Sequence, residues 1–239
     1  MLYNYINKYK FRGQSFMEIM KTEKGYLTIL TGKTDMGKST ITVYDYSELL
    51  KVGKRVIFFS YEYCQSIIYN KLISHFKTNW SQLFNLNIID ANGLNLQSLI
   101  NIVRNKKGNV DAIYIDYLDL LKNSTYPNDK ENDPKELEHI QEIIRQLADL
   151  AHELDIPVVL LSQTGSSTNF EKSVERLNAF CETVENNNVI KMFIGKGNVI
   201  DSRIQYDDIV HVILIDGYDL KHFSSVNIRE IYKADPLSR

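Results

Sequence analysis

The chain has 239 residues, of which 44% are hydrophobic and 24% charged, as in an ordinary globular protein with one large domain or at most two small ones. Its net charge of -2 excludes a protein held on nucleic acid by overall basicity, so any such contact requires a local basic patch. Two cysteines exclude a disulfide framework. No apolar run approaches the roughly 18 residues of a membrane span, so we expect a cytoplasmic protein with no membrane partner.

The N-terminal segment alternates aromatic, aliphatic and basic side chains, as in Tyr3, Lys8 and Phe11. We interpret residues 1–12 as an N-terminal arm with two alternatives. It packs on its own domain, or it docks on a neighbouring subunit as an inter-subunit linker. Residues 13–239 then form the main domain.

A phosphate-binding motif lies at residues 32–39, which fit the pattern G-x-x-x-x-G-K-[ST] at every fixed position. A predicted strand over 25–31 precedes it, and a predicted helix follows it. This context favours nucleotide binding over an ordinary glycine-containing turn, because backbone N–H groups and the helix N-terminus then converge on phosphates. We predict that Lys38 neutralises the β- and γ-phosphates and that Ser39 ligates Mg²⁺. The predicted nucleotide contacts are Gly32, Lys33, Thr34, Asp35, Met36, Gly37, Lys38, Ser39 and Thr40.

Two further strands are expected to end near this motif. Residues 55–60 predict the second strand, which places Glu62 beyond its carboxyl end, where ligands bind in open α/β sheets. Residues 110–116 predict an apolar strand that ends in Asp116. A carboxylate there can hold Mg²⁺ through water while Ser39 binds the metal directly. Because an aspartate also commonly starts a turn, this pattern gains its weight from the phosphate-binding motif.

Helices alternate with these strands. Apolar spacing predicts helices near 40–50, 67–73, 94–103 and 135–153, with a short strand at 86–90 and a polar loop at 123–134. His139 and His152 have no partner at metal-ligand spacing, and we interpret both as residues of the helix surface. Residues 156–163 predict a buried strand that ends in Gln163. That amide either faces solvent or contacts the γ-phosphate or the attacking water.

The alternation of apolar strands and helices predicts an α/β fold with a mainly parallel sheet covered on both faces. Residues 164–190 are polar and turn-rich around one short helical pattern, and we expect them to be mobile. Later strands are predicted at 189–194, 209–215 and 226–232. A turn at Asp216-Gly217 would make the last two an antiparallel C-terminal extension of the sheet.

In their order, these segments resemble the RecA-like motor domain of DnaB-type hexameric replicative helicases, over about residues 13–235. Residues 30–39 look like that family's Walker A motif, including Met36 before the second glycine. Phe59-Ser60-Tyr61-Glu62 resembles its second-strand motif, and residues 113–121 closely follow its Walker B segment. Residues 156–163 match the strand with its sensor glutamine, and 202–208 are loosely similar to the stretch after its DNA-contacting loops.

The resemblance implies a P-loop ATPase that uses ATP and Mg²⁺ and grips single-stranded DNA. It also implies assembly as a homo-oligomeric ring, which is hexameric in the family, with other replication proteins as candidate partners. Glu62 would be the general base for the attacking water. The catalytic residues implied are Lys38, Glu62, Asp116 and Gln163. The family also uses a cation from the next subunit, and the candidates for this trans-acting cation are Lys233, Arg229 and Arg239. DNA contacts have as candidates Lys172, Arg176, Lys191, Lys196 and Arg203, although scattered surface cations are the commoner explanation of such residues.

The chain departs from the family's pattern in three places. We expect no counterpart of the family's N-terminal, primase-binding domain. Where the family ends its last strand in Lys-x-Arg, this chain has Lys233-Ala234-Asp235, so an aspartate stands at the position of the arginine finger. Residues 164–200 diverge, so the DNA-binding loops do not transfer residue by residue.

Two other functions therefore stay open. One is a RecA-fold ATPase without unwinding activity, such as a recombinase-like filament, a helicase loader or accessory factor, or a KaiC-like regulatory ATPase. The other is a non-enzymatic, nucleotide-dependent regulatory or defence module. Because Glu62, Asp116 and Gln163 are all present, we expect an intact hydrolytic site.

Overall fold

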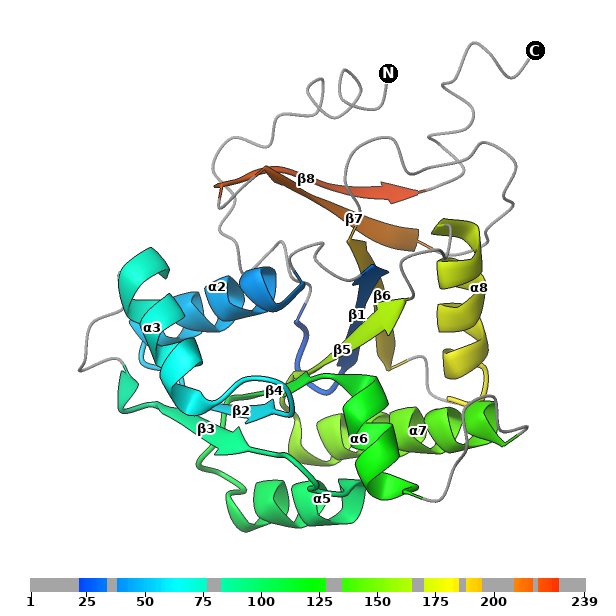
Figure 1. Ribbon diagram of the computed structural model, residues 1–239, viewed down its shortest axis with the longest axis horizontal. Helices are drawn as coiled ribbons and strands as arrows, with labels where there is room; N and C mark the ends of the chain where they lie inside the picture. Colours follow the sequence, from blue (N-terminus) through cyan, green and yellow to red (C-terminus); the bar gives the residue numbers. More distant parts are fainter. Residues whose placement is uncertain are drawn as a thin grey trace.

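The computed structural model describes residues 22–33, 38–76, 83–127, 135–164, 170–184, 188–194, 209–216 and 219–227. Their strands form one sheet in the order β3-β2-β4-β5-β1-β6-β7-β8 (Figure 1). The strands are β1 (Leu27–Lys33), β2 (Val56–Ser60), β3 (Leu86–Asp90), β4 (Ala112–Asp116), β5 (Val158–Thr164), β6 (Val189–Ile194), β7 (Ile209–Asp216) and β8 (Asp219–Asn227). The helices are α2 (Lys38–Lys51), α3 (Gln65–Phe76), α5 (Leu96–Asn105), α6 (Leu118–Thr125), α7 (Glu136–Leu154) and α8 (Phe170–Cys181).

The sheet is parallel from β3 through β7, and β8 runs antiparallel to β7. Parallel neighbours need crossover connections, and helices supply most of them. Strand β1, which leads into the phosphate-binding motif, is paired on both sides, with β5 and with β6. The predicted α/β fold with a mainly parallel sheet is therefore confirmed.

Alternate residues of the strands face two separate hydrophobic cores. On β4, Ile113 and Ile115 belong to the core covered by α5, α6, α7 and α8, whereas Ala112 and Tyr114 belong to the core covered by α2 and α3. The two groups of helices lie on opposite sides of the sheet (Figure 1). Strands that are apolar on both faces require this double cover, because either face would otherwise meet water.

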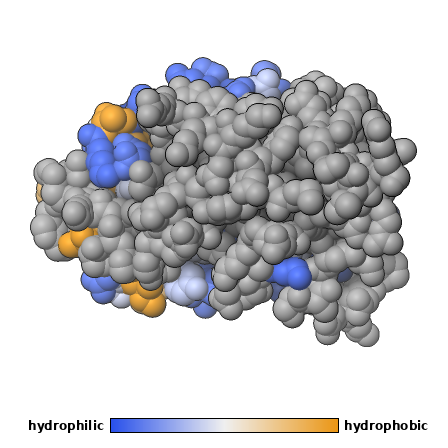
Figure 2. All heavy atoms as spheres, turned by 90° about the horizontal axis from the view of Figure 1, so that it is seen from above, coloured by the Kyte–Doolittle hydropathy of each residue, from blue (hydrophilic) through white to orange (hydrophobic). Residues whose placement is uncertain are grey.

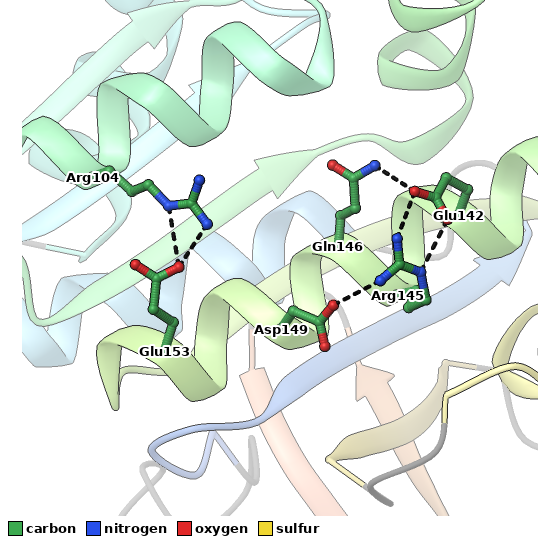
Figure 3. Close-up of polar contacts among 6 residues, drawn as sticks. All are labelled: Arg104, Glu142, Arg145, Gln146, Asp149 and Glu153. Carbon is green, nitrogen blue, oxygen red and sulfur yellow. Dashed lines mark hydrogen bonds and ion pairs between the residues drawn. The ribbon is translucent and has the colours of Figure 1, made fainter.

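Helix α7 shows how spacing selects a buried face. Its buried residues recur at intervals of three and four, and they are Ile140, Ile143, Ile144, Leu147, Ala148, Leu150 and Ala151. The outer face carries Arg145, which is 2.7 Å from Glu142 and 3.0 Å from Asp149, while Glu153 meets Arg104 of α5 at 2.6 Å (Figure 3). Exposed pairs of this kind contribute about 0–1 kcal/mol each. The apolar face, and not these pairs, therefore holds α7 on the sheet.

Helix α6 differs from the prediction. The pattern predicts a polar loop from Asn123 onward, whereas α6 continues to Thr125. Leu118 and Leu121 are the buried apolar residues of this helix and Leu120 is partly buried, which is too little for a periodic signal. The hydroxyl of Thr125 donates to the Leu121 carbonyl at 2.7 Å and accepts from the Leu96 amide at 3.0 Å. These bonds fix the last turn of α6 to the start of α5.

The bounds of other elements also differ. β1 runs two residues beyond the predicted 25–31, and β8 covers 219–227 where the prediction begins at 226. The helical pattern predicted within 164–190 forms α8. Residues 1–12, 195–208 and 228–239 lie outside the described part, so the predictions that fall there stay predictions. None of the described helices has the length and apolarity needed to cross a membrane.

Few large hydrophobic side chains are exposed among the described residues. Figure 2 shows one face of the molecule, and on that face the coloured residues form several hydrophilic areas and a few small hydrophobic ones. The large hydrophobic side chains exposed among the described residues are Val52, Ile67, Phe84 and Leu137. They come from different segments of the chain.

Candidate nucleotide-binding site

The predicted site residues follow the carboxyl ends of neighbouring strands. β2, β4, β5 and β1 are consecutive in the sheet. Ser60 of β2 is in register with Asp116 of β4, and Gly32 of β1 is in register with Gln163 of β5. The Tyr61 amide donates to the Asp116 carbonyl at 2.9 Å, which holds the segment after β2 against the end of β4. Because these strands are parallel, all of these residues lie at one edge of the sheet, where α/β proteins bind ligands.

Lys38 begins α2 and turns back over the start of the phosphate-binding motif. Its ammonium donates to the carbonyls of Gly32 and Lys33, both at 2.7 Å, and the residue is 6% exposed. The Thr42 hydroxyl donates to the Lys38 carbonyl at 3.0 Å and so supports the first turn of the helix. The structure therefore brings the positive charge of Lys38 to the end of β1.

A tight turn after β2 presents Glu62. The buried Ser60 hydroxyl donates to the Tyr63 carbonyl at 2.6 Å and accepts from the Tyr63 amide at 3.1 Å. The two bonds close residues 60–63 into a turn, and Glu62 at its tip is exposed. The Tyr61 hydroxyl points the other way, since it donates to the Leu94 carbonyl at 2.8 Å.

Negative charge gathers beside Asp116. Asp116 is 2% exposed at the end of β4. The next residue, Tyr117, has a hydroxyl whose pKa is raised by burial, and the carboxylates of Asp119, Glu62 and Asp116 raise it further. The charges of Asp119, Glu62 and Asp116 thus all act on one hydroxyl beside the end of β4. A cation brought in with a nucleotide would be stabilised there.

The oxygen donors at this edge fit Mg²⁺. Ser39 lies half-buried in the first turn of α2, and Asp116 supplies a carboxylate. Mg²⁺ prefers hard oxygen ligands and is usually held by one or two carboxylates together with water and substrate phosphates. In the described part of the chain, no group of three or more His, Cys, Asp or Glu side chains could hold a metal ion. Ser39 and Asp116 supply two oxygen donors, a set that water and substrate phosphates usually complete around Mg²⁺.

Sequence reasoning missed Asp119, which lies in the first turn of α6. Burial raises the pKa of its carboxyl, while the nearby Arg176 and a hydrogen bond from the backbone of Gln163 oppose that rise. Asp119 thus connects the end of β5 to helix α8. The available signal was a second carboxylate three residues after Asp116. It gains meaning only once α6 is known, because one helical turn carries Asp119 back toward the sheet.

Two of the candidate DNA-contact residues are already engaged. A guanidinium nitrogen of Arg176 lies 3.8 Å from Asp119, and the Arg176 guanidinium is 5.1 Å from the ring centroid of Phe180. The Lys191 ammonium donates to the Asn178 side chain at 2.9 Å. Lys191 is in register with the middle of β1, so the structure does not bring it to the strand ends with Lys38.

The rest of the predicted set is not described at the level of side chains. Thr40 and Lys172 have their backbones in α2 and α8, and their side chains lie outside the described part. The residues wholly outside it are Thr34, Asp35, Met36, Gly37, Lys196, Arg203, Arg229, Lys233 and Arg239. The roles predicted for all of these stay predictions.

The strand order and the mainly parallel pairing define an α/β domain of the RecA-like fold class, with acidic and amide groups at adjacent strand ends. A solved structure described as an "ATPase Domain" matches this fold with a TM-score of 0.57, over 95% of this chain and 96% of that one. At 18% sequence identity the match supports the fold alone.

Residues 76–176 match the family model of the DnaB-like helicase C terminal domain. A protein of Chlamydia psittaci named "Probable plasmid replicative DNA helicase" is 31% identical, over 59% of this chain and 35% of its own length. A protein of Trieres chinensis named "Probable replicative DNA helicase" is 26% identical, over 64% of this chain and 38% of its own length. The match spans little more than a third of these relatives. Over residues 76–176 the chain is thus similar to the C-terminal domain of DnaB-like helicases, in agreement with the resemblance that the sequence predicts.

Proposed function

We propose that this chain is an ATP-hydrolysing motor domain of helicase type, which uses Mg²⁺ and couples hydrolysis to single-stranded DNA in a ring of identical subunits. The observation that best supports it is the common sheet edge shared by Gly32, Gln163, Asp116 and the turn that carries Glu62. The relationship to DnaB-like helicases supports DNA as the coupled ligand and a ring as the assembly.

Lys38 and the metal ligands would bind the triphosphate. The Lys38 ammonium is buried with two carbonyl acceptors at 2.7 Å. A phosphate oxygen is a charged acceptor and makes hydrogen bonds roughly twice as strong as a neutral one, so it can replace a carbonyl at this position. Ser39 and Asp116 would hold Mg²⁺, which when bound neutralises charge on the transferred phosphoryl group.

Glu62 and Gln163 would act on the attacking water. Glu62 is exposed at the tip of its turn, so water reaches the carboxylate, which orients the molecule and accepts its proton. Gln163 would hydrogen-bond the same water or the γ-phosphate. A shift of Gln163 would be passed to Asp119 through the hydrogen bond from the Gln163 backbone, and from Asp119 to Arg176. This chain of contacts offers a route from hydrolysis to helix α8. A cation from the next subunit, with Lys233, Arg229 and Arg239 as candidates, would complete charge stabilisation.

Replacing Glu62 by glutamine tests the general base. The amide cannot accept the proton, so we expect ATP turnover to fall by about 10²- to 10⁴-fold while nucleotide affinity stays within about threefold. Steady-state ATPase rates and titration with a fluorescent ATP analogue measure the two effects. Glu153→Gln is the matched control, because Glu153 is exposed on α7 and pairs with Arg104 away from the strand ends. Unchanged turnover in Glu62→Gln would remove Glu62 from the mechanism.

ATPase activity as a function of protein concentration, with and without single-stranded DNA, tests the motor. If subunits complete each other's sites in a ring, activity per subunit rises with concentration, and DNA raises it further. An ATPase rate that responds to neither variable would remove the motor and leave an isolated ATPase.

The second candidate is a RecA-fold ATPase without unwinding activity, such as a recombinase-like filament, a loader or a regulatory module. It is favoured by Asp235 at the position of the arginine finger and by the engagement of Arg176 and Lys191 with neighbouring side chains. Electron microscopy with ATP separates the two, since closed rings support the motor and filaments or monomers support the alternative. Hydrolysis above that of Lys38→Ala would exclude a non-enzymatic module.

A further inference from the structure

A buried polar pair joins the helix after the phosphate-binding motif to the strand that ends in Asp116. The Tyr114 hydroxyl of β4 donates to the Asp45 carboxylate of α2 at 2.5 Å. Asp45 is 1% exposed and Tyr114 is fully buried. The second carboxylate oxygen, Oδ1, has no hydrogen-bond partner among the described residues.

Packing alone does not account for this pair. Its surroundings are apolar and aromatic, with the ring of Tyr46 centred 5.3 Å from that of Phe58 and 5.4 Å from that of Tyr114. Replacing a buried polar pair by apolar groups of the same shape is often neutral or stabilising, because desolvation offsets most of what the hydrogen bond contributes. What a directional bond can add to close packing is specificity, because it favours one position of α2 along β4.

That position matters because α2 begins, and β4 ends, at the proposed nucleotide site. Lys38 and Ser39 open α2 seven and six residues before Asp45, about 10 Å along the helix axis. Asp116 ends β4 two residues after Tyr114 on the same face of the strand, about 7 Å away. The hydrogen bond therefore lies behind the site, between the two elements that supply Ser39 and Asp116.

We propose that Asp45 and Tyr114 are positioning residues that set the separation of Ser39 from Asp116, and through it the joint hold of these two residues on Mg²⁺. The inference rests on the proposed nucleotide site. A slide of α2 along β4 would move Ser39 relative to Asp116. Lys38 would keep its place relative to the phosphate-binding motif, because the motif and α2 are one continuous segment. The pair therefore acts on metal-dependent nucleotide binding and leaves metal-independent binding unaffected.

The test compares four variants of the full chain. Tyr114→Phe removes only the donor oxygen, and Asp45→Leu removes the acceptor at similar volume. Asp45→Asn keeps an oxygen acceptor for the Tyr114 hydroxyl and serves as the conservative rescue. Tyr46→Phe is the matched control, because it removes the same atom from the neighbouring residue of α2, where the hydroxyl has no hydrogen-bond partner among the described residues.

Dissociation constants of a fluorescent ADP analogue are measured in EDTA and in Mg²⁺, together with kcat and KM for ATP, at a temperature where circular dichroism shows every variant folded. For Tyr114→Phe and Asp45→Leu we expect the gain in affinity on adding Mg²⁺ to fall about tenfold, as loss of one buried hydrogen bond allows. Affinity in EDTA stays within about twofold, and kcat falls more than KM rises. Asp45→Asn and Tyr46→Phe stay within about twofold of the wild type.

If Tyr114→Phe and Asp45→Leu both gain as much nucleotide affinity on adding Mg²⁺ as the wild type does, the inference is overturned. The pair is then purely structural. A loss in Asp45→Asn as large as in Asp45→Leu would also overturn it, because an oxygen acceptor would then be insufficient. If the wild type and Tyr46→Phe both fail to bind nucleotide, the proposed function itself fails. That result differs from failure of the inference, in which the wild type binds normally.

Discussion

Asp45 shows what a single buried carboxyl does to the whole protein. Burial raises its pKa from 3.8 to about 7, the hydrogen bond from Tyr114 opposes the rise, and the charge of Glu48 adds to it. The unfolded chain exposes the same carboxyl to water, where it titrates near its ordinary value. Between these two pH values the folded state therefore binds more protons than the unfolded state, so this carboxyl stabilises the fold at low pH and less so as pH rises through 7.

We expect the free energy of unfolding of the wild type, relative to Asp45→Asn, to fall by about 2–3 kcal/mol between about pH 5 and about pH 8. The amide of the variant does not titrate, and all other groups, including Asp111 and Glu142 with their lowered pKa values, are shared by both proteins. Urea denaturation at several pH values measures the difference. Parallel pH profiles for the two proteins would contradict it.

Among the elements, α6 carries more of the site than its length suggests. It begins two residues after Asp116, holds Asp119 beside Gln163 and Arg176, and is anchored by Leu118 and Leu121.

Replacing Leu121 by alanine should destabilise the fold by about 2–5 kcal/mol, because the side chain is fully buried and the helix has few other apolar contacts. Leu137→Ala is the control, since Leu137 is 41% exposed on α7, and we expect it to cost under about 1 kcal/mol. Chemical denaturation measures both. Equal effects would show that α6 is held by something other than its buried face.

How far the elements could be predicted depends on how much apolar surface each one buries. β4 and α7 are readily predicted, the first from a continuous apolar run that ends in Asp116 and the second from seven buried residues at helical spacing. α6 is not, because Leu118 and Leu121 alone make no period. Because α6 is not predicted, Asp119 is not predicted as a site residue either, since its position depends on that helix. Chain-end motifs such as Lys233-Ala234-Asp235 fall outside the described residues and stay predictions.

For the whole molecule, the sequence predicts a parallel sheet and polar strand ends, but not which strands are neighbours. Neighbour order comes from long-range pairing, as in the register of Gly32 with Gln163. This order shapes the candidate site, because it sets Asp116, Gln163 and the turn that carries Glu62 at the ends of successive strands beside β1.

The central place of β1 predicts slow hydrogen exchange. The amides of Ile29 and Leu30 lie in a strand paired on both sides and are buried, whereas β3 is an edge strand. We expect exchange at Ile29 and Leu30 to require global unfolding and to be slower than at Asn87 and Ile89 of β3. Mass spectrometry of exchanged peptides measures both. Faster exchange in β1 than in β3 would contradict the strand order.

The position of β1 also governs when the protein can first function during translation. Both of its neighbours, β5 and β6, lie far downstream, with about 125 residues between Lys33 and Val158. A nascent chain that has emerged from the ribosome only as far as α7 has the complete phosphate-binding motif but no strand to hold it in place. If the chain binds ATP as proposed, nucleotide capture would therefore wait until β5 is made, because β1 has no neighbouring strand before then.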